Sequence, residues 1–169
     1  KLWGRKLLGI PILSSQEILR IDNSTSSISY SGKHFLHSWD AKNENISGLI
    51  ELKENQISKI GVIAKVADFK SGNSSLDSNS FRVLDALKIP NIIFRSTDIV
   101  ETLDIISVYG TISFHGIEKA INVTLNKSND NDIVSLNGKF IIKLSDFNVK
   151  RPSLLLQQIN LLKYQNLMG

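Results

Sequence analysis

The sequence predicts an all-β fold, an antiparallel barrel or sandwich of about eight strands with a short helical insertion. Apolar residues alternate with polar ones through most of the chain, which is the period of strands with one buried face. Short runs rich in Asn, Asp, Ser and Gly separate these stretches. No helical pattern lies between successive strands, so the sequence disfavours a parallel α/β sheet.

The segment from Ile60 to Val66 shows the alternation clearly, with Lys65 on the wet face. Asn137 and Gly138 have turn composition and predict a connection between two strands. His115 and Gly116 predict a tight hairpin turn, with His115 exposed to solvent. These turns divide the alternating runs into the predicted strands.

One segment departs from the alternation. Between Leu76 and Leu87, large apolar residues recur at spacings compatible with a short helix. Asp77 or Ser78 is the predicted N-cap, and Pro90 ends the segment.

Composition narrows the class of protein. A length of 169 residues fits one domain. The net charge of +4 is modest and the basic residues are spread along the chain, so we expect no nucleic-acid binding. The absence of cysteine excludes disulfides and thiolate metal sites. Residues 1–17 are predicted to be an N-terminal arm or the remnant of an export signal, and residues 18–169 the barrel domain.

The sequence offers no catalytic machinery. His34 and His37 are three apart in what looks like extended chain, which predicts opposite faces and no shared metal ion. A nucleophile elbow and a glycine-rich phosphate loop are both missing. We therefore expect no enzyme activity, no catalytic residues, no metal site and no cofactor.

The inner face of a barrel of about eight strands is either filled by side chains or open to one small ligand. Several inward positions are small or medium-sized, including Ala64, Gly110 and Val123. Aromatic residues such as Phe94 and Phe140 could equally fill the space. Composition leaves this choice open.

Five stretches, in order, resemble the YceI-like family of polyisoprenoid-binding proteins, and the resemblance covers about residues 18–165. They are residues 21–30 (IDNSTSSISY), 68–77 (DFKSGNSSLD), 84–97 (LDALKIPNIIFRST), 110–119 (GTISFHGIEK) and 140–149 (FIIKLSDFNV). Residues 33–39 (KHFLHSW) are similar to a variant of the family's second strand.

The resemblance implies a lipocalin-like, extended antiparallel barrel that is exported to the bacterial periplasm or secreted. Its long hydrophobic tunnel would carry or store an isoprenoid quinone, a polyprenyl chain or a fatty-acid-like amphiphile. The residues expected to line the lumen are Ile28, Tyr30, Phe35, His37, Trp39, Ile50, Leu52, Val62, Ala64, Val66, Phe69, Phe81, Leu84, Leu87, Ile92, Phe94, Val108, Gly110, Ile112, Phe114, Val123, Phe140, Ile142, Leu144 and Phe147.

Four polar residues near the expected mouth are candidates to orient a ligand's head group, namely Tyr30, His37, Asn73 and Asp77. The apolar loop that starts at Arg151 is expected to cap the mouth or contact a membrane. A second copy of the chain is a further expected partner. Two alternatives stay open: a ligand-free structural or stress-response module with a filled core, and a hydrolase or lipid-modifying enzyme that uses His34 or His37.

Overall fold

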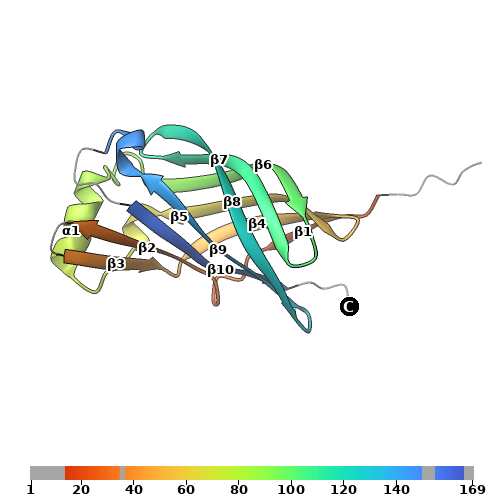
Figure 1. Ribbon diagram of the computed structural model, residues 1–169. Coiled ribbons are helices and arrows are strands. Elements are labelled where there is room, and N and C mark those ends of the chain that lie inside the picture. The colour runs from red at the N-terminus through yellow and green to blue at the C-terminus, as the bar shows by residue number, and fades with distance from the viewer. Residues whose placement is uncertain (1–13, 35–36, 150–154, 166–169) are drawn as a thin grey trace, which may run out of the picture.

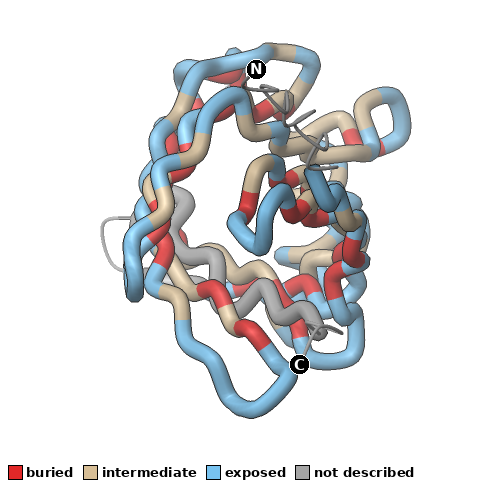
Figure 2. The backbone as a smooth tube through the Cα atoms, turned by 90° about the vertical axis from the view of Figure 1, so that its right-hand side faces the viewer, coloured by how far each residue is buried: buried red, intermediate tan, exposed pale blue. Residues whose placement is uncertain are grey.

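The chain forms one antiparallel sheet that curls strongly into a barrel-like shell, as predicted (Figures 1 and 2). The computed structural model describes residues 14–34, 37–149 and 155–165, and only the backbone of residues 33–34, 37–39 and 155–165. Within these residues the sheet has ten strands rather than about eight. One short helix accompanies it, and no described helix is long and apolar enough to cross a membrane.

The elements follow one another with short connections. The strands are β1 (Gln16–Arg20), β2 (Ser27–His34), β3 (His37–Asn43), β4 (Ile46–Lys53), β5 (Gln56–Lys65), β6 (Asn91–Glu101), β7 (Ile105–Phe114), β8 (Ile117–Asp130), β9 (Ile133–Lys143) and β10 (Leu155–Gln165). The helix α1 (Ser74–Val83) and the 3-10 turns η1 (Val66–Asp68) and η2 (Leu144–Phe147) connect or follow them. β1 begins at Gln16, ahead of the domain boundary predicted at Ile18.

The N-terminal stretch joins the two ends of the curled sheet. β1 pairs with β4, with Leu19 opposite Ile50, and β2 pairs with β10, with Ile28 opposite Ile159. Between them, the Ile21 N–H donates to the Gly48 carbonyl at 3.0 Å. Because only residues 21–26 separate β1 from β2, one stretch of chain supplies backbone hydrogen-bond partners to β4 on one side and to β10 on the other.

The free edge of β3 is covered by the segment that follows β5. Lys42 and Lys70 exchange two backbone hydrogen bonds, each 2.9 Å long. The side-chain amide of Asn43, which is fully buried, donates to the Lys65 carbonyl at 3.0 Å. These bonds fix η1, and with it α1, at one end of the barrel, beside β2 and β3 (Figure 1).

β8 and β9 pair only near their shared turn. Their ladder joins Leu125–Asp130 to Ile133–Gly138, and beyond Gly138 the two strands separate, as Figure 1 shows. A Cβ atom on Gly138 would lie 2.6 Å from the Thr124 carbonyl oxygen. Only glycine therefore fits at the point where the two strands separate. The turn predicted at Asn137 and Gly138 is therefore wrong, since both lie within β9.

β5 and β6 also separate, and side chains replace the missing ladder. Their pairing stops at Gly61 and Arg95. Beyond it, the Ile60 N–H donates to Ser96 Oγ at 2.8 Å, and the Ile57 N–H donates to Glu101 Oε2 at 2.7 Å. Glu101 also forms an ion pair with Lys127 of β8, and both side chains are largely buried. This pair lies at the end of β6 that is remote from α1.

The helix begins earlier than predicted. Asn73 is the N-cap, and its Oδ1 accepts from the Ser75 and Leu76 N–H groups at 3.0 and 3.2 Å. The predicted cap at Asp77 or Ser78 is wrong, because the Asp77 carboxylate instead accepts from the N–H and Oγ of Ser71 at 2.9 and 2.6 Å.

Leu87 lies beyond the helix, after Asp85 takes a positive φ of 49°, and its side chain is 84% exposed. Its predicted position in the lumen is therefore wrong.

Replacing Glu101 with Ala should lower the free energy of unfolding by about 3 kcal/mol, because it leaves Lys127 largely buried without its partner and the Ile57 N–H without an acceptor. Urea unfolding would measure the loss. Glu44→Ala, in the exposed pair with Lys42, is the control and should cost less than about 0.5 kcal/mol. Equal losses would show that the buried pair has no special role.

The hydrogen bonds from Ser71, together with nearby Lys70, hold the pKa of the Asp77 carboxyl below its usual range. The ionised carboxylate therefore stabilises the fold above its ordinary pKa of about 4, and this contribution is lost as the pH falls through the lowered folded-state value. The stability difference between wild type and Asp77→Asn should thus be constant near neutral pH and shrink in acid. Urea unfolding at several pH values would test this, with Asp132→Asn in the exposed β8–β9 turn as a control; a difference independent of pH would contradict it.

Candidate functional site

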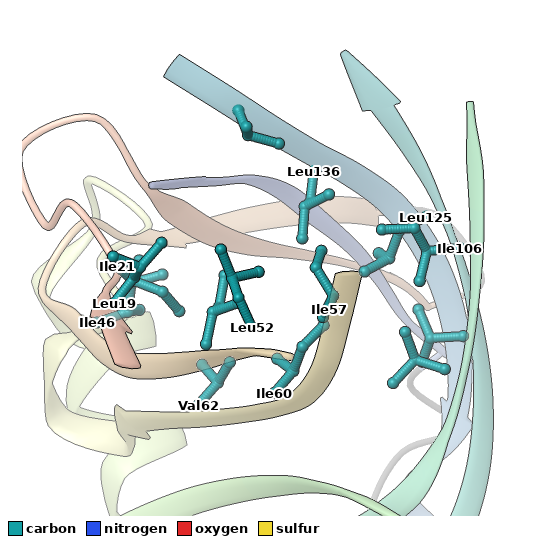
Figure 3. Packing of buried hydrophobic residues seen from close by; sticks show 14 of the residues in the cluster. Leu19, Ile21, Ile46, Leu52, Ile57, Ile60, Val62, Ile106, Leu125 and Leu136 are labelled. Atoms are coloured by element: carbon teal, nitrogen blue, oxygen red, sulfur yellow. The ribbon is translucent and has the colours of Figure 1, made fainter. Parts of the chain in front are cut away.

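The larger of two buried apolar clusters runs along the interior from Ile46 and Ala64, at the α1 end of β4 and β5, to the end remote from α1. Figure 3 shows Leu52 of β4, Ile57 of β5 and Leu136 of β9 pointing toward one another from facing walls. Ile106 and Leu125 pack beside them, and all five are at most 4% exposed. Side chains, rather than open space, occupy this region.

The smaller cluster lies near η2. Its members are Ile112, Phe114, Ile142, Leu144, Phe147 and Val149. The rings of Phe114 and Phe147 meet nearly edge to face, with centroids 5.4 Å apart. His115 Nδ1 lies 2.8 Å from the Phe147 carbonyl oxygen, so His115 is half-buried and joins the β7–β8 turn to η2. The prediction that it is solvent-exposed is wrong.

A set of large apolar residues packs against these clusters but is only half-buried. We call this set, with Tyr30, the half-buried lining. Its other members are Ile28, Phe69, Val83, Leu84, Ile92, Phe94, Ile99, Ile117, Ile121 and Phe140. Apart from Ile28 and Ile99, they belong to α1, to its flanking loops or to strand segments on the α1 side of the barrel. Ile121 and Phe140 contact both clusters, so the lining lies between them.

Strand register places the lining on the inner face. Paired residues of an antiparallel ladder share a face. Phe94 lies opposite Val62 on one side and Ile112 on the other, and both of these are buried. Tyr30 lies opposite Ala41, which is also buried. The inner surface at the α1 end is therefore mostly aromatic and aliphatic, and it includes the exposed Lys119, which lies opposite the buried Ile112.

Tyr30 brings a hydroxyl group to this surface. Its ring packs against Phe69 with centroids 5.4 Å apart. Burial raises the pKa of the Tyr30 phenol, a hydrogen bond with Ser80 of α1 lowers it, and the charge of Asp77 raises it again. The net direction is upward, so the phenol is neutral at physiological pH. It can donate or accept a hydrogen bond without a charge.

The small residues that face inward do not leave the open lumen that their size suggested, because neighbouring side chains pack against them. Gly110 is buried under the ring of Phe94, and a Cβ atom there would lie 2.8 Å from that ring and 2.3 Å from the Arg95 carbonyl oxygen. Val66 is buried as the first residue of η1. Other predicted lumen residues lie within the two clusters, namely Ile50, Leu52, Val62, Ala64, Val108, Val123, Ile112, Phe114, Ile142, Leu144 and Phe147. The accessible inner surface consists of large residues instead.

The predicted head-group residues are only partly brought together. Tyr30 and Asp77 interact, whereas Asn73 is exposed and uses its side-chain oxygen to cap α1. Ser80 was missed, although it lies one helical turn from Asp77 and so shares its face. Ile121 was missed as a site residue, although it belongs to an alternating run. Phe81 is half-buried on α1.

Some expectations lie outside the described residues. They concern Phe35, the side chains of His37 and Trp39, and the loop that starts at Arg151. The backbone nevertheless corrects one prediction. His34 and His37 are direct partners across the β2–β3 ladder, so these positions share a face instead of lying on opposite ones. The antiparallel pairing of β2 with β3 causes the difference.

Among the residues that the structure describes, no group of three or more His, Cys, Asp or Glu side chains could hold a metal ion. The polar groups at the α1 end are instead Tyr30, Ser80, Ser71 and Asp77. This arrangement combines a half-buried apolar inner surface with hydroxyl and carboxylate groups at the α1 end.

Solved structures share this fold. BcnA of Burkholderia cenocepacia superimposes with a TM-score of 0.76 at 17% identity, over 83% of this chain and 98% of that one. A polyisoprenoid binding domain from Saccharophagus degradans, described as implicated in plant cell wall breakdown, gives a TM-score of 0.72 at 12% identity, over 88% and 99%. The YCEI protein of Campylobacter jejuni gives 0.66 at 18% identity, over 76% and 86%.

No curated protein sequence resembles the chain closely enough to count as a match. The model of the YceI-like domain, in contrast, matches residues 19–163, which run from the end of β1 into β10. The resemblance noted in the sequence is thereby confirmed: the chain belongs to the YceI-like domain family.

Proposed function

We propose that this chain binds and carries or stores an apolar chain-like lipid, with the tail of the lipid against the half-buried lining. The observation that carries the proposal is the lining itself. Large side chains such as Phe94, Ile121 and Phe140 face the interior yet stay half-buried, whereas the cluster residues beside them are almost fully enclosed. Each methylene group buried against such a surface contributes roughly 0.8 kcal/mol.

The head group of this lipid is neutral in our proposal. Tyr30 offers an uncharged hydroxyl group, and Asp77 is the charged group that acts on it. A carboxylate or phosphate beside Tyr30 would be repelled by Asp77, whereas a carbonyl or hydroxyl group would pair with the phenol. We therefore favour an isoprenoid quinone or polyprenyl alcohol over a fatty acid.

The family supports the choice of an isoprenoid as the first ligand to test, because the Saccharophagus degradans relative is described as a polyisoprenoid binding domain. A lipid carrier of this kind would work in the bacterial periplasm or outside the cell, and we include that location in the proposal. The competing function, a ligand-free module with a filled core, predicts no lipid in the purified protein. Organic extraction followed by mass spectrometry distinguishes the two.

Ile121→Glu should weaken binding of farnesol at least tenfold, because it places a charge in the apolar lining. Isothermal titration would measure the affinity, and circular dichroism would confirm the fold. Ile141→Glu is the matched control, since Ile141 is 60% exposed on the outer face of β9. Equal affinity of both variants and wild type would place the ligand elsewhere, and no binding by wild type would reject the proposal.

Tyr30→Phe should lower the affinity for farnesol about tenfold, which corresponds to the loss of one buried hydrogen bond. The affinity for farnesene, the hydrocarbon of the same chain, should stay unchanged, because the ring that packs against Phe69 is retained. Parallel titrations of the two ligands supply the comparison. A similar loss for both ligands would mean that Tyr30 acts only through packing.

A further inference from the structure

We infer that the site is blind: a lipid tail that lies against the half-buried lining stops at the larger buried cluster and does not pass through the barrel. The chain would then select its ligands by tail length. This inference rests on the proposed function, and it shortens the long hydrophobic tunnel that the family resemblance implies.

Burial changes along β8 at a defined position. Ile117 and Ile121, on the α1 side, are half-buried members of the lining, and Lys119 between them on the same face is exposed. Val123 and Leu125, farther along the same face, are each 3% exposed. The accessible inner surface of β8 therefore ends between Ile121 and Val123.

β9 repeats the change in the opposite chain direction. Phe140 is half-buried, whereas Leu136 and Val134, toward the β8–β9 turn, are buried, as are Ile142 and Leu144 toward η2. β9 and β8 run antiparallel, so the two limits face the same end of the barrel. On both strands, the inner-face residues toward the β8–β9 turn are buried.

The buried plug, which we define as Leu52, Ile57, Ile106, Leu125 and Leu136, closes the interior at this limit. In Figure 3, Leu52 and Ile57 from one wall and Leu136 from the opposite wall converge. Interior packing of this kind leaves no room for a methylene chain unless side chains move. A longer tail therefore meets a wall of side chains.

An ion pair lies behind the plug and adds a second barrier. Lys127 is the direct ladder partner of Leu136, and Glu101 is the direct partner of Ile106. Both charged groups therefore share the inner face with the plug, and they pair with each other. An apolar tail that displaced the plug would next separate or desolvate these charges.

The geometry sets the scale of the site. Strands rise about 3.3 Å per residue, so the part of β8 from Ile117 to Ile121 is about 13 Å long, against about 43 Å for the whole strand. The lining thus covers about a third of the length of β8. A tail longer than the lining would leave its excess outside, where it gains no further burial.

The test is a chain-length series of primary alcohols, from octanol to eicosanol, that compete with Nile red for the purified full chain. With wild type, affinity should rise about fourfold per methylene and then stay level once the tail reaches the plug. Leu136→Ala should move this break to longer alcohols. Ile141→Ala, which removes an exposed side chain from the same strand, should leave the break unchanged.

Ile106→Val is a milder variant that removes one methyl group from the plug, and it should move the break in the same direction if Leu136→Ala does not fold. An affinity that rises through the whole series without a break would overturn the blind site and leave lipid binding intact. A break that neither plug variant moves would also overturn it. Failure of every alcohol to displace the dye would reject the proposed function itself.

Discussion

The barrel depends on one stretch of chain, residues 16–34, that pairs with both ends of the sheet. β1 supplies backbone partners to β4, and β2 supplies them to β10. Without this stretch, both strands would present unpaired N–H and carbonyl groups, and the apolar inner face would open to water. Leu19, buried against the larger cluster, shows that the same stretch also contributes to the core.

The interior is divided because the wall of the barrel is not uniform. Near the β8–β9 turn the strands stay paired, and facing side chains such as Leu125 and Leu136 meet inside. Beyond Gly138 the same strands separate, and the residues between them, Ile121 and Phe140, are less enclosed. The ion pair of Glu101 and Lys127 holds the filled end together where the β5–β6 ladder is missing. The end remote from α1 is thus packed as a core, whereas the α1 end combines the smaller buried cluster with the half-buried lining.

Much of the fold could be predicted from sequence, because the alternation of Ile60, Val62 and Ala64 reports directly which face is buried. The predictions that were wrong concern residue types that can serve two different structural roles. Gly138 looked like a turn residue, yet it serves a close approach of two strands. The space left inside the barrel could not be predicted either, because it depends on which side chains lie next to each small residue. The ring of Phe94, for example, fills the place beside Gly110. Residue size alone does not contain that information.

A crystal structure of the protein, purified without removal of bound lipid, tests the central claim most directly. The account predicts a continuous tube of electron density that starts near Tyr30, touches Phe94 and Ile121, and ends before Leu136. A lining closed by its own side chains, with no such density, would contradict the claim that this surface holds a lipid. Density that continues past Leu136 to Lys127 would contradict the division of the interior into a filled end and a lined end.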